Sequence, residues 1–172
     1  MPVGGSPPLR FGHEPGRWVA CDYAVRPPIL EGILGKLGVT PERDAFATEG
    51  NKRFEKWYGE GSPDGEDAFE KTWGSEVLWI NPPFNVIPRV LDKIVADRAH
   101  AILIVPYWRK YKFFGRAQEL AVDSVKIPKG EIMFERKGKP QKGVPWDVYA
   151  FLVCGHEPPC LPHRAWGEPP IF

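Results

Sequence analysis

The sequence is poor in cysteine and has no long apolar run. Its three cysteines, Cys21, Cys154 and Cys160, are too few and too scattered for a disulfide framework. No apolar run approaches the roughly 20 residues that span a bilayer. The first residues also lack the basic start and apolar stretch of a secretory signal. These absences predict a soluble, intracellular protein with no membrane among its partners.

Patterns of metal ligands and catalytic nucleophiles are also scarce. Potential ligands gather only near the C-terminus, where Cys154, His156, Cys160 and His163 lie within ten residues. We expect no metal site there, because the spacing matches no common zinc finger and a cysteine that ends an apolar strand is usually just buried. No Ser-His-Asp or catalytic Cys-His pairing stands out.

Length and composition favour one domain. A chain of 172 residues with 42% hydrophobic content is long enough for one filled core and short for two. Prolines concentrate near both ends, where hydrophobic periodicity disappears. We therefore predict a flexible extension over 1–20, an α/β domain over 21–155 and a proline-rich tail over 156–172.

Positive charge is concentrated in one stretch of the chain. Residues 105–145 carry 10 basic and 4 acidic side chains, a net charge of +6, whereas residues 1–104 carry 12 basic and 15 acidic side chains. A local cluster of this kind suits nucleic-acid binding, because phosphate neutralisation depends on local charge and not on the overall balance. A solvated loop and helix face is the alternative.

Two apolar runs and the helical pattern between them predict a βαβ unit. Residues 77–80 and 101–105 are compact runs of the buried-strand type, and apolar residues recur at helical spacing over 86–95. Two such strands joined by a crossover helix predict a parallel sheet, with its ligand crevice at the carboxyl ends of the strands. Other predicted elements are a helix over about 26–37, a short strand at 43–48, a strand or helical turn at 51–58, a helix at 110–120 and strands near 122–127, 131–135 and 146–153. The last two strands are expected to form a hairpin around the basic loop 136–143.

The turn Asn81-Pro82-Pro83-Phe84 follows the strand 77–80 directly. An exocyclic amino nitrogen is a poor nucleophile because its lone pair is delocalised into the ring, so an enzyme that methylates it gains by accepting hydrogen bonds from both N–H groups. The Asn81 side-chain oxygen and the Pro82 carbonyl suit this role, and the two prolines keep the turn rigid. Phe84 offers a flat ring to a base extruded from its stack. The alternative is an ordinary turn signal.

The order of the motifs resembles a known family. Residues 43–114 are similar to phage-type Dam-like DNA N6-adenine methyltransferases, including the related domain of some retroelement polyproteins. The resemblance rests on Asp44-Ala45-Phe46-Ala47-Thr48 with Asn51 downstream, Asp67-Ala68-Phe69, Val77 to Phe84 and Val105-Pro106-Tyr107-Trp108. It implies a compact Rossmann-like class I methyltransferase fold, with a mostly parallel central sheet closed by an antiparallel β-hairpin.

The resemblance also implies a function and a cofactor. The implied protein is a site-specific, adenine-specific DNA methyltransferase that uses S-adenosylmethionine. We expect it in the cytoplasm or with host nucleic acid. The implied catalytic residues are Asn81, Pro82, Pro83 and Phe84. The implied cofactor-binding residues are Asp44, Ala45, Phe46 and Ala47 at the end of the first strand, and Asp67, Ala68 and Phe69 near the adenine of the cofactor. The residues themselves also allow a turn carboxylate at Asp44 and a helix N-cap at Asp67.

Two basic segments are candidates for contact with DNA, with RNA as the alternative partner. The candidate residues are Trp108, Arg109, Lys110 and Lys112 in the first segment, and Arg136, Lys137, Lys139 and Lys142 in the second. The first interleaves aromatic and basic residues, which suits stacking on bases and contact with phosphates. The second is suited to phosphate contact as a hairpin tip. The alternatives are a core helix with exposed lysines and a soluble turn.

Three hypotheses about function follow. The first is methyl transfer to the N6 amino group of adenine in DNA. The second is a catalytically silent nucleic-acid-binding module derived from such an enzyme, such as a domain of a mobile element. The third keeps the chemistry and changes the acceptor to an RNA adenine or a protein glutamine.

Overall fold

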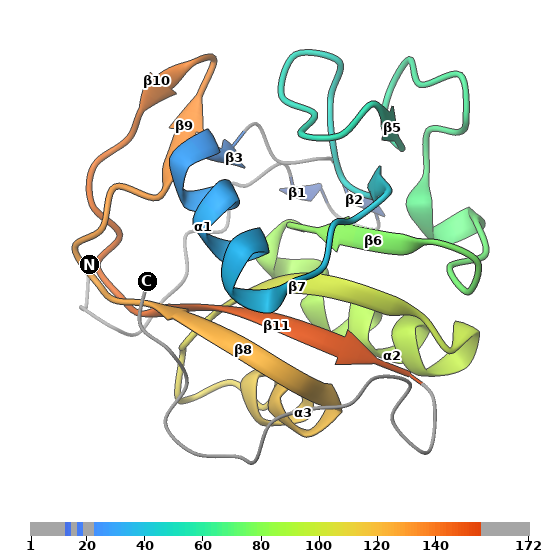
Figure 1. The fold of residues 1–172 in the computed structure, drawn as a ribbon. Helices are drawn as coiled ribbons and strands as arrows, with labels where there is room; N and C mark the ends of the chain where they lie inside the picture. Colours follow the sequence, from blue (N-terminus) through green and yellow to red (C-terminus); the bar gives the residue numbers. More distant parts are fainter. Residues whose placement is uncertain (1–12, 15–16, 19–22, 156–172) are drawn as a thin grey trace.

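The computed structural model describes residues 13–14, 17–18 and 23–155, and Figure 1 shows their arrangement. Near the start of the chain, β1 (His13–Glu14) and β2 (Arg17–Trp18) form a short antiparallel pair. The rest of the predicted extension 1–20 and the predicted tail 156–172 lie outside the described residues, so three of the four potential metal ligands do as well. Within the described part, no group of three or more His, Cys, Asp or Glu side chains is placed to hold a metal ion.

A mixed, mostly parallel sheet forms the centre of the molecule, as the sequence predicts. Its six strands lie in the order β5-β4-β6-β7-β11-β8. The strands β5, β4, β6 and β7 run parallel to one another, and β11 runs antiparallel to its neighbours β7 and β8. Their bounds are β4 (Arg43–Asp44), β5 (Lys56–Trp57), β6 (Val77–Ile80), β7 (His100–Pro106), β8 (Ala121–Ile127) and β11 (Val148–Cys154).

Three helices cover the two faces of this sheet. The helix α1 (Pro27–Leu37) begins with two prolines, whose missing N–H groups cost nothing in a first turn, and ends at Gly38 with a φ of 69°. Its buried side chains pack with those of Trp79 and Ile102 on one face of the sheet. The helices α2 (Ile87–Asp97) and α3 (Phe113–Leu120) pack on the other face, against a cluster that includes Leu78 and Leu103. These helices confirm the predicted ones, although α3 begins three residues later than expected.

The predicted hairpin between 131–135 and 146–153 is wrong. Instead, β9 (Phe134–Arg136) lies in a separate three-stranded sheet with β10 (Lys139–Pro140) and β3 (Tyr23–Val25), in the order β10-β9-β3. The strand β11 pairs with β7 and β8, and six of its seven residues are buried, so it requires a partner on each side. None of the three residues of β9 is fully buried. The antiparallel pair that closes the main sheet is therefore β8 and β11.

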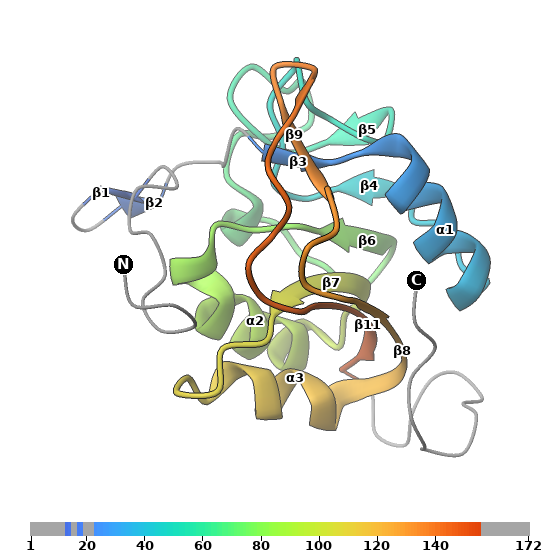
Figure 2. The same cartoon turned by 90° about the vertical axis from the view of Figure 1, so that its left-hand side faces the viewer.

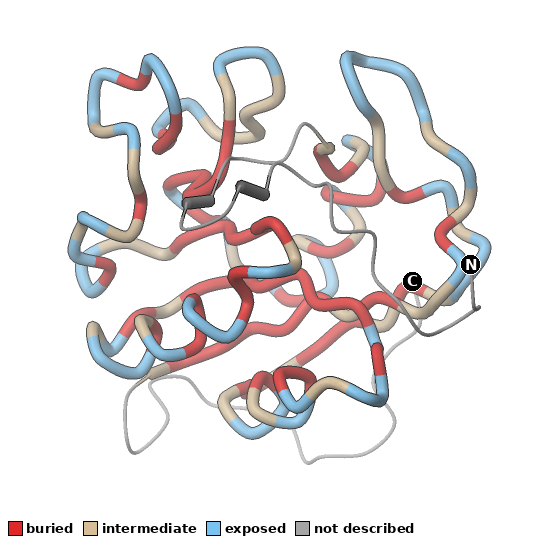
Figure 3. Tube along the Cα trace, turned by 180° about the vertical axis from the view of Figure 1, so that it is seen from behind, coloured by how far each residue is buried: buried red, intermediate tan, exposed pale blue. Residues whose placement is uncertain are grey.

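Burial is concentrated in the central strands and in the inward faces of the helices (Figure 3). In the described part of the chain, no helix has the length and apolar character needed to cross a membrane. Cys154 at the end of β11 is buried and disulfide-bonded, which the scattered cysteines did not predict.

Candidate functional site

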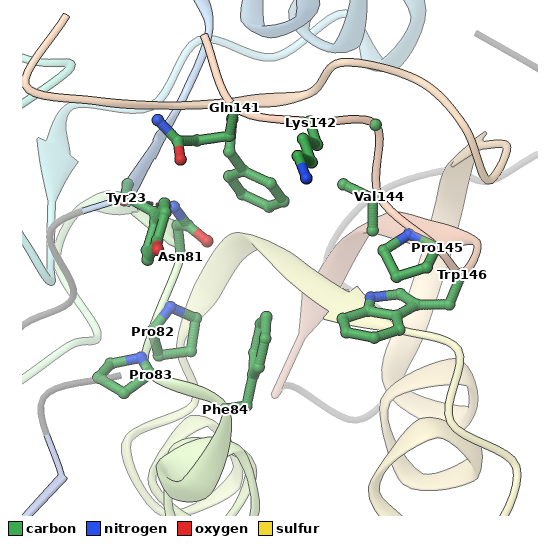
Figure 4. A pocket seen from close by; sticks show the side chains of 12 residues that line it. Tyr23, Asn81, Pro82, Pro83, Phe84, Gln141, Lys142, Val144, Pro145 and Trp146 are labelled. Carbon is green, nitrogen blue, oxygen red and sulfur yellow. Dashed lines mark hydrogen bonds between the residues drawn. The ribbon is translucent and has the colours of Figure 1, made fainter. Parts of the chain in front are cut away.

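A cavity of about 340 Å³ lies beside the carboxyl ends of the parallel strands. The turn after β6, residues 81–84, forms one wall, and the small sheet contributes Tyr23 and Phe134. The segment 141–146, which follows β10, forms the opposite wall (Figure 4). The predicted motif therefore borders a cavity at the edge where α/β folds place their ligands.

Among the residues that the structure describes, none donates a hydrogen bond to the side-chain oxygen of Asn81 in this wall. The side chain is 8% exposed, and its Nδ2 donates a long hydrogen bond of 3.5 Å to the carbonyl of Tyr23. Because a carbonyl can only accept, this contact assigns the nitrogen to the Tyr23 side of the amide. The oxygen is thus the atom left to accept from a ligand.

The neighbouring backbone supplies a second acceptor. The carbonyl of Pro83 accepts a hydrogen bond of 3.1 Å from the backbone N–H of Val86. The carbonyl of Pro82, by contrast, accepts none from the residues that the structure describes. Because Pro82 and Pro83 are buried and have fixed φ angles, the backbone holds the Pro82 carbonyl in place, while the contact with Tyr23 and its burial orient the Asn81 side chain.

The ring of Phe84 packs against other aromatic rings. The ring of Trp108 meets that of Phe84 edge to face, with 4.7 Å between the centroids, and meets that of Trp146 in the same way at 5.0 Å. Trp108 is 2% exposed. It therefore positions the two rings that line the cavity. The predicted contact of Trp108 with nucleic acid stays a prediction, which this burial does not favour.

The carboxylate of Asp44 is already engaged within the protein. Asp44 ends β4, is 3% exposed, and accepts hydrogen bonds from the backbone N–H groups of Phe46 at 3.4 Å and Arg53 at 2.9 Å. Burial raises the pKa of Asp44 to about 7, although these two hydrogen bonds and the charge of Arg53 act in the opposite direction. The interpretation of Asp44 as a turn carboxylate therefore agrees with its contacts.

The two predicted cofactor segments lie side by side. The rings of Phe46 and Phe69 meet edge to face at 5.4 Å, and the ring of Phe69 stacks on Trp73 at 6.0 Å. Asp67 accepts a hydrogen bond of 2.9 Å from the backbone N–H of Phe69, and it is the N-cap of the short 3-10 helix η1 (Ala68–Glu70). The guanidinium of Arg89 covers the ring of Phe69 at 3.9 Å. The small residues Ala45, Ala47 and Ala68 are fully buried.

A narrow hollow lies between the first predicted cofactor segment, 44–47, and the cavity, with which it shares Tyr23 and Asn81. Asp44, Phe46 and Arg53 also line this hollow, whereas residues 67–69 do not. A carboxylate and a guanidinium suit the charged methionine end of S-adenosylmethionine. The hollow has no room for a water molecule, however. The two side chains carry the charges that this group requires, but both are engaged within the protein. Entry of S-adenosylmethionine therefore requires the walls of the hollow to move apart and these contacts to be exchanged.

Arg53 joins the small sheet to the main sheet. Its Nε donates a hydrogen bond of 2.8 Å to the carbonyl of Val25 in β3, and its guanidinium pairs with Glu135 in β9. Its backbone N–H donates to Asp44 at the end of β4. Neither Arg53 nor the cavity residues Tyr23 and Trp146 were predicted from the sequence, because short strands and loop aromatics carry no periodic signal.

The basic residues gather in two segments, the turn between β9 and β10 and the loop between β7 and α3, which lie at opposite ends of the molecule in Figure 2. Residues 137–138 form a tight turn between β9 and β10, with φ angles of 52° and 79°, as in hairpins of type I′. In the second segment, Arg109, Lys110 and Lys112 lie between β7 and α3. The basic side chains of both segments are exposed, namely Arg109, Lys110, Lys112, Arg136, Lys137, Lys139 and Lys142. Of the predicted nucleic-acid contacts, Lys142 is the one that lines the cavity.

No protein-family model matches the chain, and no curated protein matches it either.

Proposed function

We propose that the chain is an S-adenosylmethionine-dependent methyltransferase that acts on the N6 amino group of adenine in DNA. The observation that supports this most strongly is the pair of free acceptors at Asn81 and Pro82, rigidly held beside a cavity with the ring of Phe84 as its wall. The mostly parallel sheet with β11 between β7 and β8 also agrees with the class I methyltransferase fold that the resemblance implies.

Each residue of the turn has one task in this proposal. The oxygens of Asn81 and Pro82 accept the two N–H groups of the amino nitrogen, so its lone pair turns away from the ring system as the nitrogen becomes tetrahedral. The ring of Phe84 stacks on the extruded base in place of its former neighbours. Bound S-adenosylmethionine would supply the methyl group, and Asp44, Arg53 and Asp67 would hold it.

Transfer of a labelled methyl group tests the proposal. The protein is incubated with labelled S-adenosylmethionine and a mixture of DNA and RNA, and the nucleosides are identified after digestion. We expect label in N6-methyldeoxyadenosine, and a loss of at least a hundredfold in Asn81→Ala, because one amino-group acceptor is removed. The exposed amide variant Gln118→Ala serves as the matched control and should keep its activity. Full activity of Asn81→Ala would exclude this mechanism.

A second candidate function is a catalytically silent nucleic-acid-binding module derived from such an enzyme. The narrow hollow at Asp44 and Arg53 favours it, because cofactor binding there requires displacement of packed side chains. Calorimetry separates the two candidates. Salt-dependent DNA binding together with no heat of S-adenosylmethionine binding would support the module, and measurable cofactor affinity would support the enzyme.

A further inference from the structure

The wall of the cavity opposite Asn81 carries an ammonium group. Lys142 lines the cavity, and Figure 4 shows its amino nitrogen pointing into it. This lysine forms no ion pair with the described residues. The surrounding lining is largely aromatic and apolar, with Phe84, Phe134, Val144 and Trp146. Because Lys142 is exposed, its ammonium is hydrated in the free protein, and a ligand in the cavity can replace that water with an acceptor atom of its own.

The backbone on both sides of Lys142 is firmly held. The N–H of Gln141 donates 2.9 Å to the carbonyl of Phe134, and the N–H of Val144 donates 3.0 Å to that of Glu131. At Gly143 a Cβ atom would lie 2.4 Å from the carbonyl oxygen of Gly130, so the two segments approach closely at this point. The fold therefore fixes the backbone at Lys142 beside the cavity, and the exposed side chain extends from this fixed point.

The polar groups of the cavity form a complementary set. One wall offers two acceptors, Asn81 and Pro82, and the opposite wall places the ammonium of Lys142 between Gln141 and Trp146. The Nε2 of Gln141 is already engaged, because it donates a hydrogen bond of 2.9 Å to the carbonyl of Lys139. This arrangement matches an amino group next to a ring nitrogen that has a free lone pair. Adenine has such a pair of groups at N6 and N1, whereas guanine presents O6 and N1–H, which place an acceptor against the acceptors and a donor against the ammonium.

We propose that Lys142 is a specificity-determining residue whose ammonium donates a hydrogen bond to N1 of the target adenine while Asn81 and Pro82 accept from N6. The inference rests on the proposed function for its substrate class. Lys142 thus rejects guanine and any adenine whose N1 is blocked. Cytosine carries an equivalent pair of groups, so the size of the cavity and not Lys142 must separate the two bases.

Atomic replacement in the base tests this assignment. Methyl transfer is measured on two DNAs of one sequence, with adenine or 1-deazaadenine, which has C–H in place of N1, at the methylated position. We expect the replacement to lower kcat/KM about ten- to a hundredfold in the unaltered protein, as for other hydrogen bonds to charged groups. In Lys142→Met the adenine substrate should lose a similar factor and 1-deazaadenine should cause no further loss, while Lys142→Arg should keep part of the discrimination. The ratio of kcat/KM on the two DNAs is compared between the proteins, because the altered intrinsic reactivity of 1-deazaadenine affects every protein equally. The exposed lysine variant Lys129→Met should discriminate like the unaltered protein.

Two further measurements keep the proposal open to refutation. The loss of kcat/KM in Lys142→Met is first measured again with 7-deazaadenine at the methylated position, and with a methylphosphonate on the 5′ side of the target. If the loss disappears with 7-deazaadenine, the lysine contacts N7, and if it disappears with the methylphosphonate, the lysine contacts a phosphate. Either result would overturn the inference. If no methyl transfer occurs at all, the proposed function has failed. Ligand-observed NMR with deoxyadenosine, 1-deazadeoxyadenosine and deoxyguanosine still decides the role of Lys142. Selective binding of deoxyadenosine that Lys142→Met abolishes supports it, and equal binding or none refutes it.

Discussion

The buried carboxyl group of Asp44 should make the stability of the protein depend on pH in an unusual direction. The pKa of Asp44 is raised from 3.8 to about 7, chiefly by burial. Between these values the folded protein keeps a proton that the unfolded chain has released. The free energy of unfolding therefore falls as the pH rises from about 4 to about 7 and levels off above 7. At about 1.4 kcal/mol per pKa unit, this group accounts for a loss of about 4 kcal/mol.

The variant Asp44→Asn isolates this contribution. An amide does not ionise, so the fall between pH 4 and pH 7 should be smaller in the variant by about 4 kcal/mol. In the unaltered protein the carboxylate accepts hydrogen bonds from the backbone N–H groups of Phe46 and Arg53, so in the variant the amide nitrogen would face one of these two donors. That conflict costs about 1–3 kcal/mol at every pH. We expect the variant to be less stable than the unaltered protein at pH 4.5 and at least as stable at pH 8.

Urea unfolding at constant ionic strength, followed by the fluorescence of the seven tryptophans, measures both curves. The variant Asp92→Asn is the matched control, because it also replaces one carboxylate by an amide, at a side chain that is 73% exposed. Its stability curve corrects for the loss of one negative charge. Parallel stability curves for the unaltered protein and Asp44→Asn would refute the reasoning, because the pH dependence would then arise from other groups.

Two further variants test packing and the join between the sheets. In Gly59→Ala the new Cβ would lie 1.8 Å from the carbonyl oxygen of Ala47, and we expect a loss of more than about 3 kcal/mol by urea unfolding, whereas Gly35→Ala in α1 has open space and should gain up to about 1 kcal/mol. In Arg53→Met the carboxylate of Glu135 loses its partner, at a cost of about 2 kcal/mol because both side chains are partly exposed. Compared with the unaltered protein, hydrogen exchange in Arg53→Met should then speed up in β3 and β9 and stay unchanged in β7. The same change in exchange rate in all three strands, or no change in any of them, would contradict the role of Arg53.

The centre of the fold could be predicted because its signals are local. The unit from β6 through α2 to β7 is marked by two apolar runs and a helical repeat, and β6 ends at Ile80, just before Pro82 and Pro83. The position of the candidate site follows from this unit alone, since the carboxyl end of a parallel strand is where α/β folds bind ligands. The helix α1 was predictable for the same reason, from its repeat and from Gly38.

Pairings between distant segments could not be predicted. The strand β11 lies between β7 and β8, although β8 and β11 are separated along the chain by β9 and β10. The strands β3, β9 and β10 have two or three residues each, too few for any period to appear. The alternation of aromatic and basic residues at 107–114 likewise does not distinguish a ring that faces the core from one that faces solvent. Trp108 is the example, since it is buried between Phe84 and Trp146.

The two halves of the candidate site consequently differ in how they are supported. The acceptors at Asn81 and Pro82 follow β6, an inner strand of the main sheet, and need no ligand to take their positions. The opposite wall and the hollow beside Asp44 depend on the small sheet, which Arg53 joins to the rest through side-chain contacts. Side-chain contacts at a partly exposed join are weaker than the hydrogen bonds within a sheet. If the proposed function holds, movement that admits S-adenosylmethionine should therefore occur at this join, and Asn81 and Pro82 should keep their positions while it does.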